Sequence, residues 1–204
     1  GRDILHGDES LPYASTTQSP YSDTKIEAER LVHAAHDAAG LRTISIRPHV
    51  VYGPGDGRFM PAIYDRALAG KLTLGVGRDQ RLSDFTYIDN LVDALVLADA
   101  ALVRDASLGG RPYFVNDGQP RAFWDFVDAV LVELGLPKTR GRVPFAVAYT
   151  VAAVAEGYRA MRGVKPGHED GLTRYAVRYM CTHHYFDISA ARTALGYAPA
   201  VDTD

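Results

Sequence analysis

The sequence predicts an α/β fold in which helices alternate with short strands along the chain. Long segments with apolar residues at helical spacing alternate with short β-branched or aromatic runs, and glycine or proline follows most of them. Such an alternation is typical of βαβ units with a parallel sheet. The 204 residues hold fewer strands than a complete doubly wound sheet requires. We therefore expect either a small sheet or one whose first half is absent.

The first quarter of the chain is expected to contain a loop, a helix and a strand. Residues 1–20 are rich in Gly, Pro, Ser and Thr, which predicts a loop. Apolar residues recur at helical spacing over residues 21–39, and Gly40 is a suitable helix end. Polar and apolar residues alternate within a strand expected over residues 41–51, with Pro48 ending its regular pairing.

The remainder predicts further helices separated by strands and loops. Helices are expected up to residue 69 and over residues 88–103, 123–134, 143–161 and 187–196, the last capped by Asp187. Short strands are expected over residues 72–76 and 113–115, and a mobile loop over residues 163–171.

The composition argues against several classes of protein. A net charge of −3 gives no reason to expect nucleic acid or an anionic membrane as a partner. A single cysteine, Cys181, excludes an internal disulfide and a thiolate zinc cluster, and it favours a reducing, cytoplasmic location. No apolar run approaches the roughly 20 residues that span a bilayer, so we expect no integral membrane segment. His183 and His184 adjoin Cys181, but neighbouring strand residues point to opposite faces, so we expect no metal site there.

Tyr21 and Lys25 are the candidate catalytic residues. They lie four positions apart on a predicted helix, so their side chains share one face. A phenol with an ordinary pKa of about 10 is a poor acid at neutral pH, and a nearby ammonium group favours the phenolate and so assists proton transfer. The same spacing also arises by chance in surface pairs, so the wider sequence must decide.

The wider sequence resembles the extended short-chain dehydrogenase/reductase superfamily, and within it the 3β-hydroxysteroid dehydrogenase group. The motifs that carry the resemblance are "GDESLPY", "PYSDTKIEAERLV", "IRPHVVYGPGD", "LSDFTYIDNLVDA", "RPYFVNDGQP" and "YFDISAARTALGYAP". They cover nearly the whole chain in the order of the family. The resemblance implies a Rossmann-like doubly wound sheet, with its N-terminal half missing from this chain, and a small α/β substrate-binding domain. Residues 1–55 would belong to the Rossmann domain, residues 56–204 mainly to the substrate region, and residues 84–117 would return to the Rossmann sheet.

The resemblance also implies a role for each site residue. Tyr21 would protonate a ketone oxygen, or accept the proton in the reverse direction, and Lys25 would stabilise its phenolate. Both residues would also contact the cofactor, Lys25 by binding the nicotinamide ribose. Pro48 and the backbone of His49, Val50 and Val51 would lie against the nicotinamide of NAD or NADP. Pro48 is equally explained as the end of a strand, and His49 is expected to line the site or fill space.

Two parts of the family pattern have no match. No GxxGxxG segment is present for the cofactor pyrophosphate, since "GPGDG" occupies a different place in the family scheme. The third catalytic residue, a Ser or Thr, would fall just before Gly1. The chain therefore resembles the C-terminal portion of such an enzyme, and we expect it to be inactive by itself. The residue that distinguishes NAD from NADP also lies outside the sequence.

The region after the catalytic helix would supply the substrate pocket. Candidate lining residues are Tyr52, Arg58, Phe59, Tyr87 and the helix from Phe145 to Tyr158. On the sequence alone, core packing is the better explanation of the aromatic and apolar members, and Arg58 could equally be solvated. Nucleotide-sugar epimerases and dehydratases usually carry an arginine where this chain has Ser83, which argues against a diphosphate substrate.

The apolar segment 143–155 favours a sterol-like or long-chain substrate. The C-terminal motif is similar to that of bacterial 2-alkyl-3-oxoalkanoate reductases. We thus expect an NAD(P)-dependent oxidoreductase that interconverts a ketone and a secondary alcohol. The alternatives are a nucleotide-sugar epimerase or dehydratase and a non-catalytic relative or inactive fragment. The family also implies a homodimer through the helix that begins at Tyr21, although alanines on that helix serve packing within a monomer equally well.

Overall fold

A computed structural model of the chain describes residues 2–14, 20–37, 40–78, 80–163 and 172–203. The chain divides into two compact units. The α3 unit comprises Leu5–Phe59, Asp84–Pro120 and Tyr185–Asp204, and the α5 unit comprises Gly1–Ile4, Met60–Ser83 and Arg121–His184. Three elements have residues in both units: β1 (Ile4–Gly7), α2 (Phe59–Leu68) and β10 (His184–Phe186).

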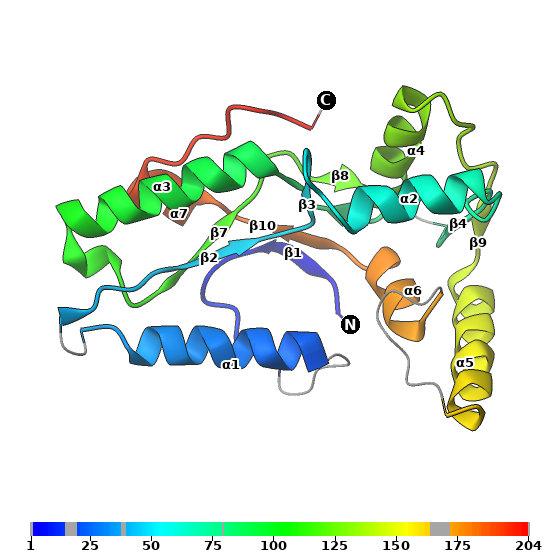
Figure 1. Cartoon of the computed structure of the whole chain (residues 1–204), viewed down its shortest axis with the longest axis horizontal. Helices are drawn as coiled ribbons and strands as arrows, with labels where there is room; N and C mark the ends of the chain where they lie inside the picture. The colour runs from blue at the N-terminus through cyan, green and yellow to red at the C-terminus, as the bar shows by residue number, and fades with distance from the viewer. Residues whose placement is uncertain (1, 15–19, 38–39, 79, 164–171, 204) are drawn as a thin grey trace. The chain divides into compact units, whose positions relative to one another are not determined.

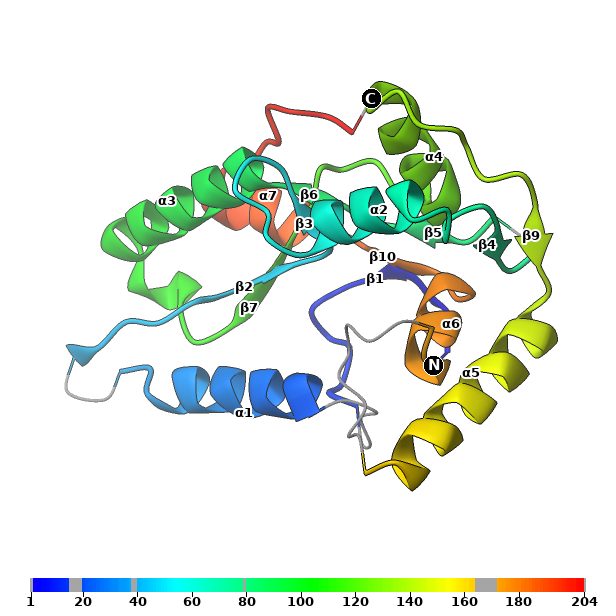
Figure 2. The same ribbon diagram turned by 45° about the vertical axis from the view of Figure 1, so that its right-hand side comes forward.

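The α3 unit is built on parallel strand pairs. Strand β2 (Ser45–Pro48) pairs with β7 (Pro112–Val115), with Ser45 opposite Pro112 and Pro48 opposite Val115. Strand β3 (Val51–Tyr52) pairs in parallel with β6 (Thr86–Tyr87). Figures 1 and 2 show α3 (Ile88–Arg104) and α7 (Ser189–Leu195) on one side of the β2–β7 pair and α1 (Pro20–Ala34) on the other. A short 3₁₀ helix, Ala106–Leu108, follows α3.

The hydrophobic core of the α3 unit lies between α3, α7 and β7. Alanines of α3 permit close approach of the helix because they add little bulk on the face that meets the sheet. The core consists of Ala94, Ala98, Ala101, Tyr113, Phe114, Val115, Ile188, Ala191, Leu195 and Tyr197. Because β2 and β7 run parallel, their carboxyl ends lie at the same edge of the sheet. This is the edge at which ligands bind in open α/β sheets.

The α5 unit combines short strand pairs with helices. Strand β4 (Gly75–Val76) pairs in parallel with β9 (Arg142–Val143), and β5 (Leu82–Ser83) pairs antiparallel with β8 (Arg121–Ala122). Strand β10 joins β5 in parallel through His184 opposite Ser83. Besides nearly all of α2, the unit contains α4 (Phe123–Glu133), α5 (Phe145–Met161) and α6 (Arg174–Met180), and α5 packs against α6.

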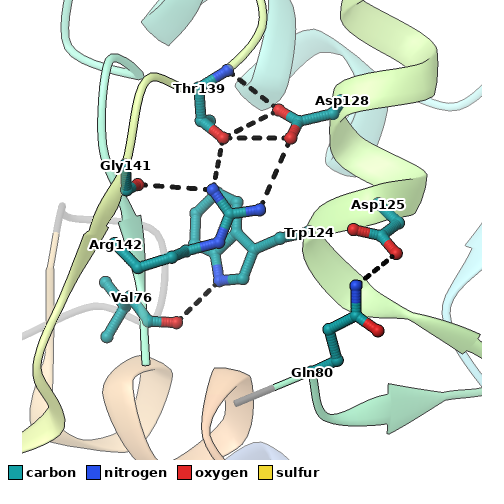
Figure 3. Close-up of polar contacts among 8 residues, drawn as sticks. All are labelled: Val76, Gln80, Trp124, Asp125, Asp128, Thr139, Gly141 and Arg142. Carbon is teal, nitrogen blue, oxygen red and sulfur yellow. Dashed lines mark hydrogen bonds and ion pairs between the residues drawn. The ribbon is translucent and has the colours of Figure 1, made fainter. Parts of the chain in front are cut away.

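Polar contacts tie α4 to the β4–β9 pair in the α5 unit (Figure 3). The Asp128 carboxylate accepts hydrogen bonds from the Thr139 backbone and hydroxyl at 2.9 Å each, and Arg142 donates to the same carboxylate at 3.4 Å. The Trp124 indole donates to the Val76 carbonyl at 2.8 Å. These contacts satisfy buried polar groups where strands of only two residues give few ladder bonds.

Several expected elements have different bounds from those the sequence predicts. The helix predicted over residues 21–39 ends at Ala34, because Asp37 takes a left-handed conformation with φ 61°; residues 38 and 39 lie outside the described part. The strand predicted over residues 41–51 is confined to β2, and Val50, with φ 35°, interrupts it before β3. The strand predicted over residues 72–76 is only β4.

Other predictions at the chain ends are wrong in detail. The first 20 residues include strand β1, whose Ile4 amide donates to the His183 carbonyl at 2.8 Å. Helix α6 was not predicted, although Thr173 caps it by accepting from the Ala176 amide. The helix predicted from residue 143 begins at Phe145, because residues 142 and 143 form β9.

The last helix differs at its start and agrees at its end. Ile188, not Asp187, is its cap residue, although the Asp187 carboxylate accepts from the amide of Ser189, the first residue of the helix. Gly196 ends the helix in the left-handed conformation, as predicted. Most of the loop expected over residues 163–171 lies outside the described residues. No helix in the ranges described is long and apolar enough to cross a membrane.

Candidate active site

Tyr21 and Lys25 lie together in the first turns of α1. Pro20 opens the helix, where its fixed φ and missing N–H carry little cost. One turn separates the two side chains, and the Lys25 Nζ lies 5.5 Å from the centroid of the Tyr21 ring. The Tyr21 side chain is 59% exposed, and Lys25 is exposed beside it. The predicted pair is therefore adjacent and open to a ligand from solution.

A partly buried ion pair holds α1 against strand β2. The Glu29 carboxylate accepts from the Arg47 Nε of β2 at 2.9 Å and from the Tyr13 hydroxyl at 2.6 Å. Both charged side chains are largely buried, at 14% and 19% exposure. Burial by itself would raise the pKa of Glu29, but the hydrogen bonds from Arg47 and Tyr13 outweigh it and leave that pKa below its ordinary value.

Sequence reasoning missed this anchor. Glu29 follows Lys25 by one further turn on the same helical face, which was the available signal. Its partner Arg47 lies on another element, so no local spacing predicts the contact. Because the anchor fixes the rotation of α1 against β2, we regard Glu29 and Arg47 as positioning residues for the Tyr21–Lys25 pair.

Replacing Glu29 with glutamine is expected to destabilise the fold by about 2–3 kcal/mol, because it leaves a largely buried guanidinium without its carboxylate. Chemical denaturation at neutral pH measures the change. The lowered pKa of Glu29 means that this contribution is present above the ordinary value of 4.5 and is lost as pH falls through the folded-state pKa. The advantage of the native protein should therefore shrink in acid.

Glu27→Gln is the matched control for this prediction. Glu27 is on the same helix, is 63% exposed and lies 3.9 Å from Arg30. Such surface pairs contribute little, so the control should change stability by less than about 0.5 kcal/mol. Equal losses of stability in the two variants would show that Glu29 contributes only a negative charge to the helix and that its contact with Arg47 adds nothing.

The segment after β2 carries the residues predicted to meet the nicotinamide. Pro48 is the exposed last residue of β2, and His49 follows it with its ring 5.4 Å from that of Phe186. The Thr86 hydroxyl donates to the His49 carbonyl at 2.7 Å and accepts from the His49 amide at 3.2 Å. Val50, with φ 35°, adopts a conformation that β-branched residues rarely take, so this turn is strained. Thr86, which sequence reasoning did not select, holds the strained turn.

The predicted substrate residues form an aromatic cluster beside a cavity. Tyr52 contacts Tyr87 edge-to-face with centroids 5.5 Å apart, and both Tyr52 and Phe59 lie near Phe85 at 6.4 and 6.5 Å. A cavity of about 530 Å³ is lined by Val51, Tyr52, Arg58, Phe59, Ile88 and the "GPGDG" loop. Tyr21, Lys25 and Tyr87 are not among its lining residues. The structure thus brings Tyr52, Arg58 and Phe59 to one cavity and Tyr21 and Lys25 to one helix.

Two buried carboxylates, those of Asp117 and Asp84, accept hydrogen bonds from residues in and around the aromatic cluster. Asp117 accepts from the Tyr87 amide at 2.8 Å, from Asn90 at 2.7 Å and from the Tyr52 hydroxyl at 3.1 Å. Asp84 accepts at 2.7 Å from both the Asn116 amide group and the Phe186 backbone. Asp117 thereby fixes the hydroxyl of one predicted substrate residue and the backbone of another.

Burial raises the pKa of Asp84 to about 7, with hydrogen bonds from Phe186 and Asn116 opposing the shift and the nearby Asp117 adding to it. A folded-state pKa above the unfolded value near 3.8 means that the folded protein binds the extra proton. The contribution of this proton to the free energy of unfolding is fully present below the unfolded-state pKa and is lost as pH rises through about 7.

Asp84→Asn should therefore gain stability relative to the native protein between pH 5 and pH 8, by about 2 kcal/mol, because the amide resembles the protonated acid. Denaturation curves at the two pH values measure the difference. Asp65→Asn, at an exposed position of α2, should show no such trend. A difference that stays flat or falls with pH would contradict a protonated Asp84.

His183 and His184, which follow Cys181 after Thr182, have structural partners. The His183 Nδ1 accepts from the Leu82 amide at 3.1 Å, and the His184 ring stacks on Tyr179 with centroids 4.8 Å apart. Burial lowers the pKa of His184 to about 4. Within the described ranges, no three His, Cys, Asp or Glu side chains are grouped so that they could hold a metal ion.

Comparison with known proteins shows the family. Residues 1–146 match the 3-beta hydroxysteroid dehydrogenase/isomerase family. The chain belongs to this family. Over 97% of its length it is 36% identical to a 2-alkyl-3-oxoalkanoate reductase of Stenotrophomonas maltophilia, and over all of it 33% identical to the decarboxylating sterol-4-alpha-carboxylate 3-dehydrogenase of Mus musculus. The chain spans 59% and 57% of these relatives, respectively.

Solved structures of lower identity confirm the α/β fold class. A UDP-glucuronic acid 4-epimerase from Bacillus cereus, solved with NAD, matches the entire chain with a TM-score of 0.67 at 20% identity and 54% coverage of that protein. A dTDP-glucose 4,6-dehydratase from Bacillus anthracis matches 98% of the chain with a TM-score of 0.61 at 17% identity and 52% coverage. At these identities the likeness concerns the Rossmann-like fold alone.

Proposed function

We propose that the protein to which this chain belongs is an NAD(P)-dependent oxidoreductase that interconverts a ketone and a secondary alcohol on an apolar substrate. The observation that carries the proposal is the Tyr21–Lys25 pair, adjacent and exposed on α1 in a member of this family. The names of the relatives favour a long-chain 3-oxo acid or a sterol-like compound as substrate. Since the chain spans under two thirds of those relatives, the activity is proposed for the whole protein.

Tyr21 and Lys25 would divide the work of proton transfer. The Tyr21 hydroxyl would donate its proton to the carbonyl oxygen of the ketone, and the Lys25 ammonium would stabilise the phenolate left behind. The bound nicotinamide would supply the hydride. Both side chains are exposed, so a cofactor ribose could contact Lys25 from the solvent side. The strained turn at Pro48, His49, Val50 and Val51 would form the backbone wall against the nicotinamide ring.

The division of roles between regions is also proposed. Residues 1–55, with residues 84–117, would belong to the cofactor domain, and the rest mainly to the substrate region. Tyr52, Arg58, Phe59 and Tyr87 would contact the substrate, and the cavity beside the first three supports this assignment.

A homodimer through α1 and a cytoplasmic location complete the proposal. No residue of α1 is completely buried, and its Leu31 side chain is 62% exposed, which supports a second copy packing on this helix. The single cysteine supports a reducing compartment.

Product analysis with the full-length protein tests the reaction class. We expect a 2-alkyl-3-oxo acid or a sterol ketone to be reduced to the secondary alcohol in the presence of reduced NAD or NADP. UDP- and dTDP-sugars are the comparison, because the fold is shared with epimerases and dehydratases of such sugars. Conversion of a nucleotide sugar without conversion of any apolar ketone would overturn the proposal in favour of that class.

A further inference from the structure

A second cavity, inside the α5 unit, is lined by three arginines. Its volume is about 470 Å³, and its wall includes Arg78, Arg81 and Arg178. Arg78 and Arg81 come from the segment between β4 and β5, and Arg178 comes from the last turn of α6. Guanidinium groups that converge on one cavity repel each other and bind carboxylate or phosphate oxygens well. The described lining contains no Asp or Glu, although Arg81 pairs with Asp3 from outside it, so an anionic ligand would face Arg78 and Arg178 in particular.

Arg178 is held in place by an aromatic neighbour. Its guanidinium donates to the Tyr149 hydroxyl at 2.8 Å and lies 5.1 Å from the centroid of the same ring. This hydrogen bond uses one of five N–H donors of an arginine. Arg81 is partly balanced by Asp3, with 3.7 Å between Nη1 and Oδ2. A preorganised guanidinium loses less entropy when it binds an anion, which favours a binding role over a random surface cluster.

The cavity wall also has an apolar side. Phe145, the first residue of α5, lines it and stacks on Tyr149 with centroids 5.3 Å apart. Half-buried Cys181 also lines the cavity. Its sulfur lies close to Gly77, which has no side chain; a Cβ there would be only 3.0 Å from the sulfur. A ligand that fits both walls has an oxyanion head attached to an apolar body.

We infer that this cavity binds the carboxylate of an apolar acid substrate, with Arg78 and Arg178 as its specificity-determining residues. The inference rests on the proposed function, and it narrows the substrate class to acids in preference to neutral ketones or sterols. It also revises the argument from Ser83. That residue is 3% exposed within β5, but Arg81 reaches an anion-binding cavity from two positions earlier. The cavity therefore presents arginine side chains, Arg78 and Arg178 among them, although Ser83 replaces the expected arginine.

Equilibrium binding to the full-length protein tests this site without any turnover. The probes are octanoate, 1-octanol and UDP, measured by calorimetric titration. Octanoate should bind at least about 10-fold more tightly than 1-octanol, since a charge-assisted hydrogen bond contributes that much or more. Arg178→Gln and Arg78→Gln should each remove most of that preference. Arg78 is an exposed residue outside helices and strands, so its variant decides the question if Arg178→Gln does not fold.

Arg174→Gln is the matched control, because Arg174 lies on the same helix but pairs with Glu156 and does not line the cavity. It should keep the preference for octanoate. Equal affinity for acid and alcohol, an equal loss in Arg174→Gln, or tighter binding of UDP than of octanoate would each overturn the inference. These measurements do not involve turnover of a ketone. They can therefore reject the carboxylate site without rejecting the proposed reaction, and product analysis can reject the reaction without rejecting the site.

Discussion

Replacing Lys25 with methionine is expected to lower turnover by roughly 100-fold to 10,000-fold, the range typical of a lost acid–base contribution. Methionine keeps much of the length and apolar character of the side chain and removes only its charge. The Nζ lies 5.5 Å from the Tyr21 ring, so the charge is close enough to stabilise the phenolate. The same change should weaken cofactor binding, because Lys25 is proposed to hold the ribose hydroxyls as well.

Steady-state kinetics and cofactor titration of the full-length protein measure the two effects separately. Lys71→Met is the matched control: Lys71 is exposed and outside the proposed site, so neither quantity should change. A Lys25→Met enzyme with normal turnover would remove Lys25 from the mechanism. Weakened cofactor binding with normal turnover would reduce its role to that of a ribose ligand.

The longer helices were predictable from the sequence because each has many turns over which an apolar face repeats. Helix α3 was predicted over residues 88–103 and occupies Ile88–Arg104, and α4 was predicted with similar success over residues 123–134. Strands of two residues, such as β4 and β9, have no repeat to detect, and they form only because a distant partner supplies the ladder. The early end of α1 depends on the left-handed Asp37, which local helical propensity does not reveal.

The candidate site divides in the same way. Tyr21 and Lys25 follow from a local spacing, and the structure places them side by side. The anchor between Glu29 and Arg47 and the contact between Thr86 and His49 join residues far apart in the sequence. Such contacts depend on how the elements pack, so one sequence without its fold could not predict them. The catalytic roles themselves stay predictions until they are measured.

Replacing Tyr21 with phenylalanine is expected to lower turnover strongly with little effect on the fold. The substitution removes one hydroxyl and keeps the ring, which is 59% exposed and contributes little to the core. Without that hydroxyl no proton donor remains at the proposed position, so turnover should fall by about 1,000-fold or more. Cofactor affinity should change little, because Lys25 and the turn after β2 are intact.

The most direct test of the proposed chemistry is the turnover number of full-length Tyr21→Phe, measured beside Tyr64→Phe. Tyr64 is an exposed tyrosine of α2, so its variant loses a hydroxyl of the same kind outside the site. We predict a loss of about 1,000-fold or more in Tyr21→Phe with near-native cofactor affinity, and native turnover in Tyr64→Phe. Native turnover in Tyr21→Phe would contradict Tyr21 as the proton donor of this enzyme.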